Sequence, residues 1–306
     1  AYEIASCLVG SEMCIRDSYE WGWGQSFHFA EKLAGESFGS SIARHEYYLA
    51  MRLGLKPSDR VLDCGCGIGG PLRNIGRFSG ASIVGATINL YQVNRGNALC
   101  KQAQLDKCKL VQADFHKLPF DDASFDHCYS IEACCHSPDR KDVYREVYRT
   151  LKPGGCFVSY EWCLTDKYDA SNAAHRLAKK KIEEGDGLPD MCHTSECDAA
   201  LKAVGFELVD ARDAALDANP GGEAWYTRTT RGASLDAPSH VVTLSVSSTH
   251  RSGGVPRSKS GKIVAWSRYA VAQSVPTRPS SAGTAMNPNR RAMIRPQRLR
   301  SSASAS

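Results

Sequence analysis

The chain contains, at residues 60–71, the stretch Arg-Val-Leu-Asp-Cys-Gly-Cys-Gly-Ile-Gly-Gly-Pro. An apolar run that meets an acidic residue and then closely spaced glycines is typical of a buried β-strand, a tight turn and the first turn of a helix. Because glycine has no side chain, such a turn lets a ligand lie against the backbone. The stretch therefore predicts a ligand site at the end of a strand.

The glycines alone do not identify the ligand. Gly65, Gly67 and Gly70 also satisfy the G-x-G-x-x-G dinucleotide fingerprint. However, a dinucleotide places its pyrophosphate on the helix N-terminus, where the carboxylate of Asp63 would repel it. S-adenosylmethionine has no phosphate and carries a sulfonium and an ammonium group instead. Asp63 therefore favours S-adenosylmethionine, and a glycine turn that binds nothing is the remaining alternative.

The segments around this turn alternate between strand and helix patterns. A helix is expected over 41–55 before the turn, and strands are expected over 81–86, 109–113, 125–131 and 156–161, with a helix over 141–151. This alternation predicts an α/β fold of the Rossmann-like class: a mostly parallel sheet with helices on both faces and ligands at the carboxyl ends of the strands.

Polar side chains follow each expected strand at this ligand-binding edge. A single such residue is usually a helix cap or a solvated loop acid. Their recurrence at one edge predicts a site formed by Asp63, Asn89, Asp114, Glu132, His136 and Glu161.

Residues 19–29 are dense in aromatic rings and glycines, with two ionisable groups, Glu20 and His28. The spacing fits neither a helical stripe nor a strand alternation. The segment is either a hydrophobic plug on the core or one wall of an apolar pocket. The rings are those of Tyr19, Trp21, Trp23, Phe27 and Phe29.

Composition places limits on the partners of the chain. Residues 227–306 carry 13 Lys and Arg against one acid, so this tail contributes +12 to the formal net charge of +5 and the remainder carries −7. No apolar run approaches the roughly 20 residues of a membrane-spanning helix. Membrane contact is therefore expected to be peripheral, or to involve sequence that is missing from this chain.

The thirteen cysteines all lie at or before Cys197, and many fall in expected buried strands. We expect reduced thiols that act as small apolar residues. Zinc is the alternative, with two candidate ligand sets. Neither set contains a C-x-x-C pair with a partner pair, so we expect no metal site. The two sets are Cys134, Cys135 and His136, and Cys192, His193 and Cys197.

Four long motifs resemble the signature regions of the sterol 24-C-methyltransferases, which use S-adenosylmethionine. They lie at 19–29, 62–71, 129–138 and 160–168, and the shorter stretches 185–189 and 200–206 are also similar to that family. The resemblance runs from residue 19 to about residue 226 and includes Asn89, where most relatives of the family have a ribose-binding acid.

The resemblance implies methyl transfer to the Δ24 side-chain alkene of a sterol, through a carbocation that then loses a proton. It implies Tyr19, Glu20, His28 and Glu132 as catalytic residues, with Glu132 as the base and His28 as its competitor. It places the sterol against Trp21, Trp23, Phe27 and His136. The cofactor would contact Asp63, Gly65, Gly67, Gly69, Asn89, Gln92, Asp114 and Phe115.

Five segments follow from these patterns. Residues 1–18 resemble a translated sequencing adapter, which implies that the true N-terminus is missing. Residues 19–60 form the aromatic segment and leading helix, residues 61–161 the cofactor-binding core, and residues 162–226 the substrate side. Residues 227–306 show no usable periodicity and would contribute no packed structure, so the final strands of the family are expected to be missing or altered.

The tail has two interpretations. It is a basic disordered segment that binds nucleic acid or anionic lipid, or it is translated out of frame. We favour the second and expect no specific nucleic-acid partner. The resemblance implies a peripheral position on the endoplasmic reticulum, and a homo-oligomer stays open. The alternative functions are a methyltransferase for a prenylated quinol or tocopherol precursor, and an inactive ligand-binding fragment.

Overall fold

The structure is a computed structural model that describes Glu20, residues 24–213 and the backbone of residues 265–274. Tyr19, Trp21 and Trp23, the adapter-like residues 1–18 and most of the basic tail lie outside the described residues. The expectations for these segments therefore stay predictions.

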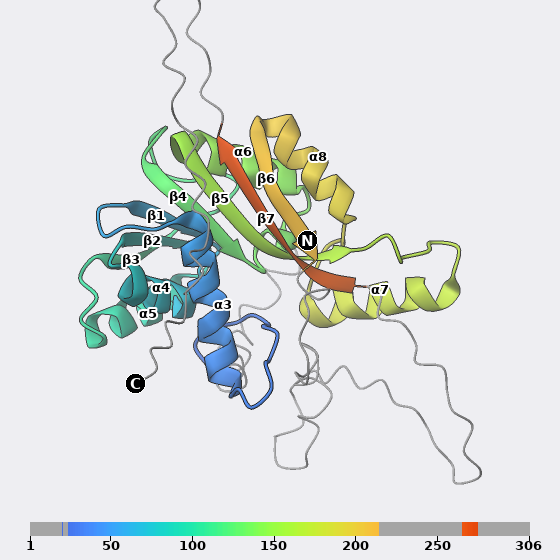
Figure 1. The fold of residues 1–306 in the computed structure, drawn as a ribbon, viewed down its shortest axis with the longest axis horizontal. Coiled ribbons are helices and arrows are strands. Elements are labelled where there is room, and N and C mark those ends of the chain that lie inside the picture. The colour runs from blue at the N-terminus through green and yellow to red at the C-terminus, as the bar shows by residue number, and fades with distance from the viewer. Residues whose placement is uncertain (1–19, 21–23, 214–264, 275–306) are drawn as a thin grey trace, which may run out of the picture. The chain divides into compact units, whose positions relative to one another are not determined.

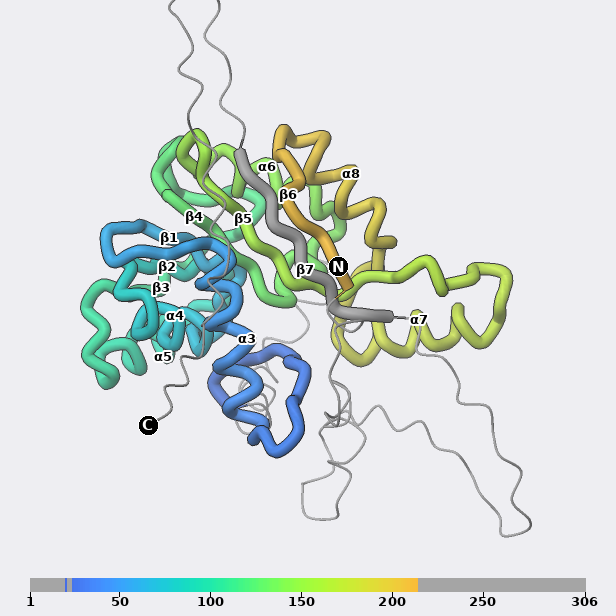
Figure 2. The backbone as a smooth tube through the Cα atoms, viewed as in Figure 1, coloured from blue at the N-terminus to red at the C-terminus, as the bar shows by residue number. Residues whose placement is uncertain are grey.

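A seven-stranded sheet forms the centre of the fold, in the order β3-β2-β1-β4-β5-β7-β6 (Figure 1). Strands β1 to β5 run parallel and side by side (Figure 2), whereas β7 is antiparallel to both of its neighbours. The strands are β1 (Arg60–Cys64), β2 (Ser82–Thr87), β3 (Cys108–Gln112), β4 (Phe125–Ile131), β5 (Leu151–Leu164), β6 (Phe206–Asp213) and β7 (Ala265–Ser274).

Helices cover both faces of this sheet. The helices are α3 (Phe38–Leu53), α4 (Gly70–Ser79), α5 (Leu90–Gln102), α6 (Arg140–Thr150), α7 (Ala173–Asp186) and α8 (Thr194–Val204), with a short 3₁₀ helix η1 (Cys134–His136). One core joins α3, α4 and α5 to one face, and a second joins α6 and α8 to the other. Neighbouring β1 residues alternate between the two cores, Val61 in the first and Leu62 in the second, as the pleat of a strand requires. The predicted fold class is confirmed.

Strand β5 is longer than predicted at both ends. The expected helix over 141–151 ends at Thr150, and β5 begins at once at Leu151. Between Phe125 and His127 the pairing of β4 with β5 shifts register, because the Lys-Pro-Gly-Gly stretch after Leu151 bulges out of the ladder and Gly154 takes φ 84°. Pro and Gly usually mark the end of a strand, so the sequence predicted that the strand begins after this stretch. In the structure the stretch is an irregularity inside β5.

Strand β7 departs from the expectation that nothing after residue 226 packs. Ala270 pairs with Ser159 of β5 and with Ala211 of β6, at the centre of two antiparallel ladders. The composition of the tail, rich in Ser and Arg, did not predict this strand. Backbone hydrogen bonds between strands can form without a regular hydrophobic periodicity in the sequence. The expectation is therefore wrong for Ala265–Ser274.

Candidate active site

The glycine turn takes a backbone shape that side chains would prevent. Gly65, Gly67 and Gly69 have φ of 85°, 53° and 75°, in the left-handed region that favours glycine. A Cβ on Gly65 would lie 2.2 Å from Cβ of Ala133, the residue after Glu132. The turn after β1 and the loop after β4 are therefore in direct contact, which brings two of the predicted site regions together.

Asp63 lies at the end of β1, next to this turn, and its side chain is 2% exposed. The hydroxyl of Tyr129 on β4 donates to Oδ2 of Asp63 over 2.9 Å. Burial raises the pKa of Asp63 to about 7, against the opposing effect of the Tyr129 hydrogen bond, with Glu46 adding to the rise and His28 reducing it. A cationic ligand beside this carboxyl would favour its charged form.

The other predicted cofactor residues lie after β2 and β3. Asn89 caps α5, with Oδ1 accepting from the backbone N–H of Tyr91 and Gln92. Oε1 of Gln92 accepts from the hydroxyl of Thr87 over 2.6 Å, at the end of β2.

Asp114 and Phe115 follow β3. Oδ1 of Asp114 accepts from the backbone N–H of His116 over 2.9 Å and lies 2.7 Å from its Nδ1. The ring of Phe115 meets His116 edge-on at 4.8 Å. The structure places Asn89, Asp114 and Phe115 at the predicted edge of the sheet, where each also stabilises its own loop.

The segment 25–28 crosses the glycine turn. A Cβ on Gly67 would lie 3.3 Å from the ring of Phe27, and one on Gly70 would lie 2.0 Å from the carbonyl oxygen of Gln25. Phe27 therefore packs on the turn that is predicted to hold the cofactor. The plug and the pocket wall are compatible interpretations here, since a ring packed on this turn would also border the predicted cofactor site.

His28 is 1% exposed and lies between two acids. Its Nδ1 lies 2.9 Å from the carbonyl oxygen of Phe29 and its Nε2 lies 3.2 Å from Oε1 of Glu46. A carbonyl only accepts, and Oε1 of Glu46 already accepts from Ser26, so both ring nitrogens face acceptors. Burial lowers the pKa of His28, but Glu46 and Glu132 outweigh it and raise the pKa above its ordinary value. The geometry favours the imidazolium.

Glu132 is held by two donors from distant parts of the chain. The backbone N–H of Phe29 donates to Oε1 over 3.0 Å, and the indole N–H of Trp162 on β5 donates to Oε2 over 3.1 Å. Burial raises the pKa of Glu132 to about 8, opposed by the charge of His28 and by both hydrogen bonds. The residue has φ 50°, a backbone conformation that costs free energy and occurs often at functional sites.

The remaining predicted residues lie elsewhere. Glu20 forms an ion pair with Arg95 of α5, with 2.6 Å between Oε1 and Nη2. His136 lies on η1 at the surface. Glu161, which is 3% exposed, accepts from the backbone N–H groups of Cys134 and Cys135 and anchors η1.

Glu46 was not among the predicted site residues, although it is fully buried on α3 and contacts both His28 and Asn74. A signal was present, because Glu46 lies one turn after Ile42 on the apolar face of that helix. A carboxyl at a core position needs partners. Tyr129 and Trp162 lie within quoted motifs, but their spacing gave no reason to pair them with Asp63 and Glu132.

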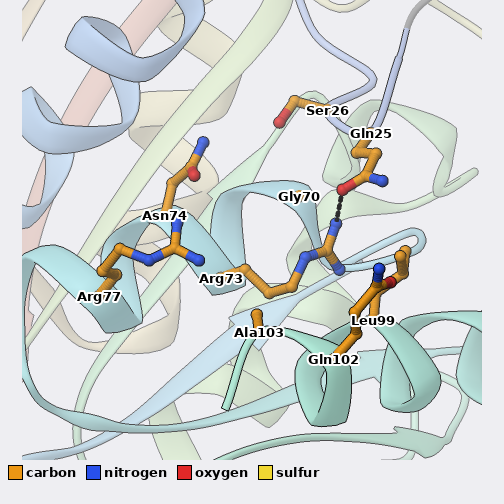
Figure 3. Close-up of a pocket in the computed structure, with 9 residues that line it drawn as sticks. All are labelled: Gln25, Ser26, Gly70, Arg73, Asn74, Arg77, Leu99, Gln102 and Ala103. Atoms are coloured by element: carbon orange, nitrogen blue, oxygen red, sulfur yellow. Dashed lines mark hydrogen bonds between the residues drawn. The ribbon is translucent and has the colours of Figure 1, made fainter. Parts of the chain in front are cut away.

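A polar cavity of about 290 Å³ lies between α4, α5 and the segment 25–26 (Figure 3). Arg73 points into it and donates to Oε1 of Gln25 over 2.7 Å, with Arg77 and Gln102 beside it. This lining of guanidinium and amide groups does not suit an apolar substrate. The cavity and the cluster around Glu132 are therefore distinct in chemistry.

The fold and the glycine turn are those of the Rossmann-like methyltransferases, and the methyltransferase domain family matches residues 62–159. Within that class, the chain is a homologue of the sterol 24-C-methyltransferases. It is 54% identical over 200 residues to the cycloartenol-C-24-methyltransferase of Arabidopsis thaliana, covering 65% of this chain and 60% of that protein. This confirms the resemblance seen in the motifs.

Two further relatives extend the comparison. The sterol 24-C-methyltransferase of Saccharomyces cerevisiae is 47% identical over 213 residues, which cover 69% of this chain and 55% of that protein. The 24-methylenesterol C-methyltransferase 2 of Oryza sativa is 49% identical over 219 residues, which cover 71% and 60%. The chain thus spans about 60% of the length of the curated relatives it matches.

Solved structures support the fold alone. The geranyl diphosphate C-methyltransferase of Streptomyces coelicolor, in complex with S-adenosyl-L-homocysteine, has a TM-score of 0.65 at 16% identity and covers 84% of this chain and 93% of that one. The [4+2]-cyclase SpnF has a TM-score of 0.60 at 19% identity, covering 84% and 90%. The fold alone therefore does not specify the reaction.

Proposed function

We propose that the chain transfers a methyl group from S-adenosylmethionine to the C-24 alkene of a Δ24 sterol. The observation that carries this proposal is a contact between two loops. The turn after β1, next to Asp63, and the loop after β4, which holds Glu132, meet at Gly65 and Ala133. A donor held at the turn would lie beside the carboxyl that receives the proton. Similarity to sterol 24-C-methyltransferases at 47–54% identity supports the sterol as substrate.

The residues at the turn fit the cofactor. Asp63 offers a buried carboxylate to the positive charges of S-adenosylmethionine, and the glycines leave the backbone open to it. The cofactor supplies the methyl group on a sulfonium. Asp63, Asn89 and Asp114 would orient it from the ends of three neighbouring strands.

The sterol alkene needs no base to attack the methyl group, because its π electrons are the nucleophile. The positive charge then lies on the sterol, in a pocket from which water must be excluded. Phe27 supplies a ring face worth roughly 0.5–2 kcal/mol to a cation. Trp21 and Trp23 lie outside the described residues, and their place in this pocket stays a proposal.

The proton is proposed to leave to Glu132. His28 is the weaker candidate, because both of its ring nitrogens face acceptors and its pKa is raised. An imidazolium at that position cannot accept a proton, but it lowers the pKa of the adjacent Glu132. Burial raises the pKa of Glu132 to about 8, which is close enough to neutral pH for a general base.

Turnover by the full chain tests the activity. The measurement uses radiolabelled S-adenosylmethionine with a panel of Δ24 sterols, beside a version that carries a family-like C-terminus. Glu132→Gln should lower alkylated-alkene formation by about 10²-fold or more, while cofactor affinity changes little. A normal rate in Glu132→Gln, with His28→Ala inactive but able to bind both ligands, would reassign the base to His28.

Cofactor binding is tested separately by calorimetry. Asp63→Ala should weaken S-adenosylmethionine binding by about 10-fold or more, because a charge-assisted contact is lost. Asp63→Asn is the matched variant, since it keeps the shape and an acceptor for the Tyr129 hydroxyl. Unchanged affinity in a folded Asp63→Ala chain would overturn the cofactor assignment.

Two alternatives make different predictions. A methyltransferase for a prenylated quinol or tocopherol precursor would label such an acceptor and leave the sterols unlabelled. A ligand-binding protein without activity would bind S-adenosylmethionine and show no turnover, which its divergent residues after 226 would explain.

Peripheral attachment to the endoplasmic reticulum is proposed from the water-insoluble substrate. No helix of the described residues is both long and apolar enough to span a membrane.

A further inference from the structure

Three cysteines surround a buried arginine on the side of the sheet that α6 and α8 cover. Sγ of Cys197 on α8 lies 3.3 Å from Sγ of Cys192 and 3.6 Å from Sγ of Cys163 on β5. Nη1 of Arg140, at the start of α6, lies 2.6 Å from Sγ of Cys192 and 2.9 Å from Sγ of Cys197. Neither the methyl transfer nor the deprotonation uses any of these residues.

The positive charge of Arg140 has an unusual set of partners. Its side chain is 6% exposed, and in the described part of the chain its hydrogen-bond partners are the three sulfur atoms and the carbonyl oxygen of Trp162. A buried guanidinium needs a counter-charge, because an unpaired buried charge is strongly destabilising. Glu161 attracts it from further away, but its oxygens already accept from Ser130, Ser159 and two backbone N–H groups.

Cys197 is the sulfur best placed to supply that counter-charge. It lies in the first turn of α8, where the helix dipole favours an anion, and it faces the Arg140 guanidinium and the thiols of Cys163 and Cys192. Hydrogen bonds from those two thiols, together with Arg140, lower the pKa of Cys197 well below its ordinary value, although burial opposes them.

We propose that Cys197 is a peroxide-reactive thiolate held by Arg140, and that Cys192 closes a reversible disulfide with it. Cys192 is half-buried and precedes α8, whereas Cys163 is fixed inside β5 and is 1% exposed. Cys192 is also the nearer of the two sulfurs. A shift of about 1.3 Å would bring the pair to the S–S bond length of about 2.05 Å.

The chemistry balances with hydrogen peroxide as the oxidant. The Cys197 thiolate attacks one peroxide oxygen, so an S–O bond forms and the O–O bond breaks. The departing hydroxide takes up a proton, and the product is a sulfenic acid and water. The Cys192 thiol then attacks the Cys197 sulfur, which expels the hydroxyl group as a second water. Two thiols are oxidised to one disulfide and one peroxide is reduced to two waters.

The position of the Arg140 guanidinium also disfavours zinc at this cluster. A guanidinium within 2.9 Å of two of the sulfurs occupies the place of a metal cation and repels it. In the described residues, no group of three or more His, Cys, Asp and Glu side chains has the arrangement of a metal site.

Peptide mapping of the full chain tests the proposal. The reduced protein is treated with one equivalent of hydrogen peroxide, free thiols are alkylated, and the chain is digested with trypsin. Residues 182–202 form one tryptic peptide that holds Cys192 and Cys197 and no other cysteine, whereas Cys163 lies in another peptide. The expected product is this peptide two hydrogens lighter and without alkyl groups. Reduction by dithiothreitol should restore both alkylation sites.

Variants separate the two roles. Cys192→Ser should stop at the sulfenic acid on Cys197, which dimedone traps, and Cys197→Ser should leave Cys192 reduced. Cys156 is the matched control, because it is half-buried and burial alone raises its pKa. Cys156→Ser should leave the disulfide yield unchanged. A peptide cross-linked through Cys163 would overturn the role given to Cys192.

The ionisation of Cys197 is measured in the wild-type chain, so that it does not depend on a variant that folds. Alkylation of Cys197 should be nearly independent of pH between 6 and 8, whereas that of Cys156 should rise about tenfold per pH unit. Arg140→Met should slow oxidation of Cys197 at least about tenfold. A Cys197 rate that rises with pH as the Cys156 rate does would refute the thiolate.

Trp162 links the cluster to the proposed catalytic carboxyl. Nη2 of Arg140 donates to the carbonyl oxygen of Trp162, whose indole donates to Glu132. Oxidation removes the negative charge next to Arg140, so we expect methyl transfer to fall severalfold and to recover on reduction. This arm rests on the proposed function. The peptide map does not depend on methyltransferase activity. A chain that is inactive but still forms the disulfide would therefore contradict the proposed function and leave the thiolate proposal intact.

Discussion

Trp162 on β5 donates its indole N–H to Oε2 of Glu132, which follows β4, over 3.1 Å. The pair joins two adjacent parallel strands at their carboxyl ends, where α/β folds place ligands. The ring of Trp162 also meets Phe29 edge-on at 5.4 Å, and Phe29 supplies the second donor to Glu132. One aromatic contact therefore fixes both donors around the carboxyl.

Removing the indole N–H should change the acidity of Glu132. In Trp162→Phe the ring remains against Phe29, but the ionised carboxyl loses a hydrogen bond. Because that bond lowers the pKa of Glu132, its loss should move the pH–rate inflection upward by about one unit. The measurement is the pH profile of alkylated-sterol formation at saturating cofactor. A lower rate with an unmoved inflection would assign Trp162 a packing role only.

Stability should fall as the pH rises through the range set by the buried carboxyls. Burial raises the pKa of Glu132 from 4.5 to about 8 and that of Asp63 from 3.8 to about 7. Between the unfolded and the folded pKa the native state binds more protons than the unfolded state, so the free energy of unfolding decreases with pH. For Glu132 the loss occurs between about pH 4.5 and 8, and for Asp63 between about pH 3.8 and 7.

Urea unfolding at pH 5 and pH 8 checks this sign. The wild-type chain should lose on the order of a few kcal/mol between these values. Glu132→Gln should lose less, since it carries no titrating group at that position. Glu184→Gln on α7 is the control, because that carboxyl is exposed and should leave the slope unchanged. Equal slopes in all three chains would contradict the buried ionisation of Glu132.

The sequence predicted what depends on local pattern. Strand β4 was placed with both ends as observed, because its apolar run and flanking loops are continuous in the chain. The sequence also predicted that Asp63 and Glu132 lie at the same edge of the sheet, because the carboxyl ends of parallel strands lie at the same edge. Periodicity and turn chemistry therefore sufficed for the sheet and for the side of it that carries the site.

Pairs that lie far apart in the chain could not be predicted in this way. Phe29 and Glu132 are separated by 103 residues, and Arg140 and Cys197 by 57. No local period relates such residues, and only the packing of whole elements brings them together. His28 is the instructive case: its intrinsic pKa favoured it as a base, but the buried Glu46 that keeps it charged lies on another element.

The close approach of the segment 25–28 to the glycine turn gives a prediction with a matched control. A Cβ on Gly70 would lie 2.0 Å from the carbonyl oxygen of Gln25, whereas one on Gly39 of α3 meets nothing within 4 Å. Gly70→Ala should therefore displace the segment that carries Phe27 and His28 and weaken both sterol and cofactor binding by about tenfold or more. Gly39→Ala should be neutral or stabilise by up to about 1 kcal/mol. Calorimetry and thermal unfolding measure both effects, and intact binding in Gly70→Ala would separate the segment from the site.

Strand β7 gives the prediction that decides between an ordered and an unpacked tail. In the described residues, β6 joins the sheet through β7, because β7 pairs with both β5 and β6. A chain that ends at residue 264 should therefore detach β6 and unfold at a temperature lower by roughly 5 °C or more. A chain that ends at residue 276 should match the full chain. Ala270→Pro, at the centre of both ladders, should resemble the chain that ends at residue 264, because proline has no N–H to donate.

Hydrogen exchange provides a second measurement of strand β7. It should show slow amides within 265–274, since paired backbone exchanges only when the sheet opens. Rapid exchange there, together with equal stability of the two truncations, would restore the expectation that nothing after residue 226 packs.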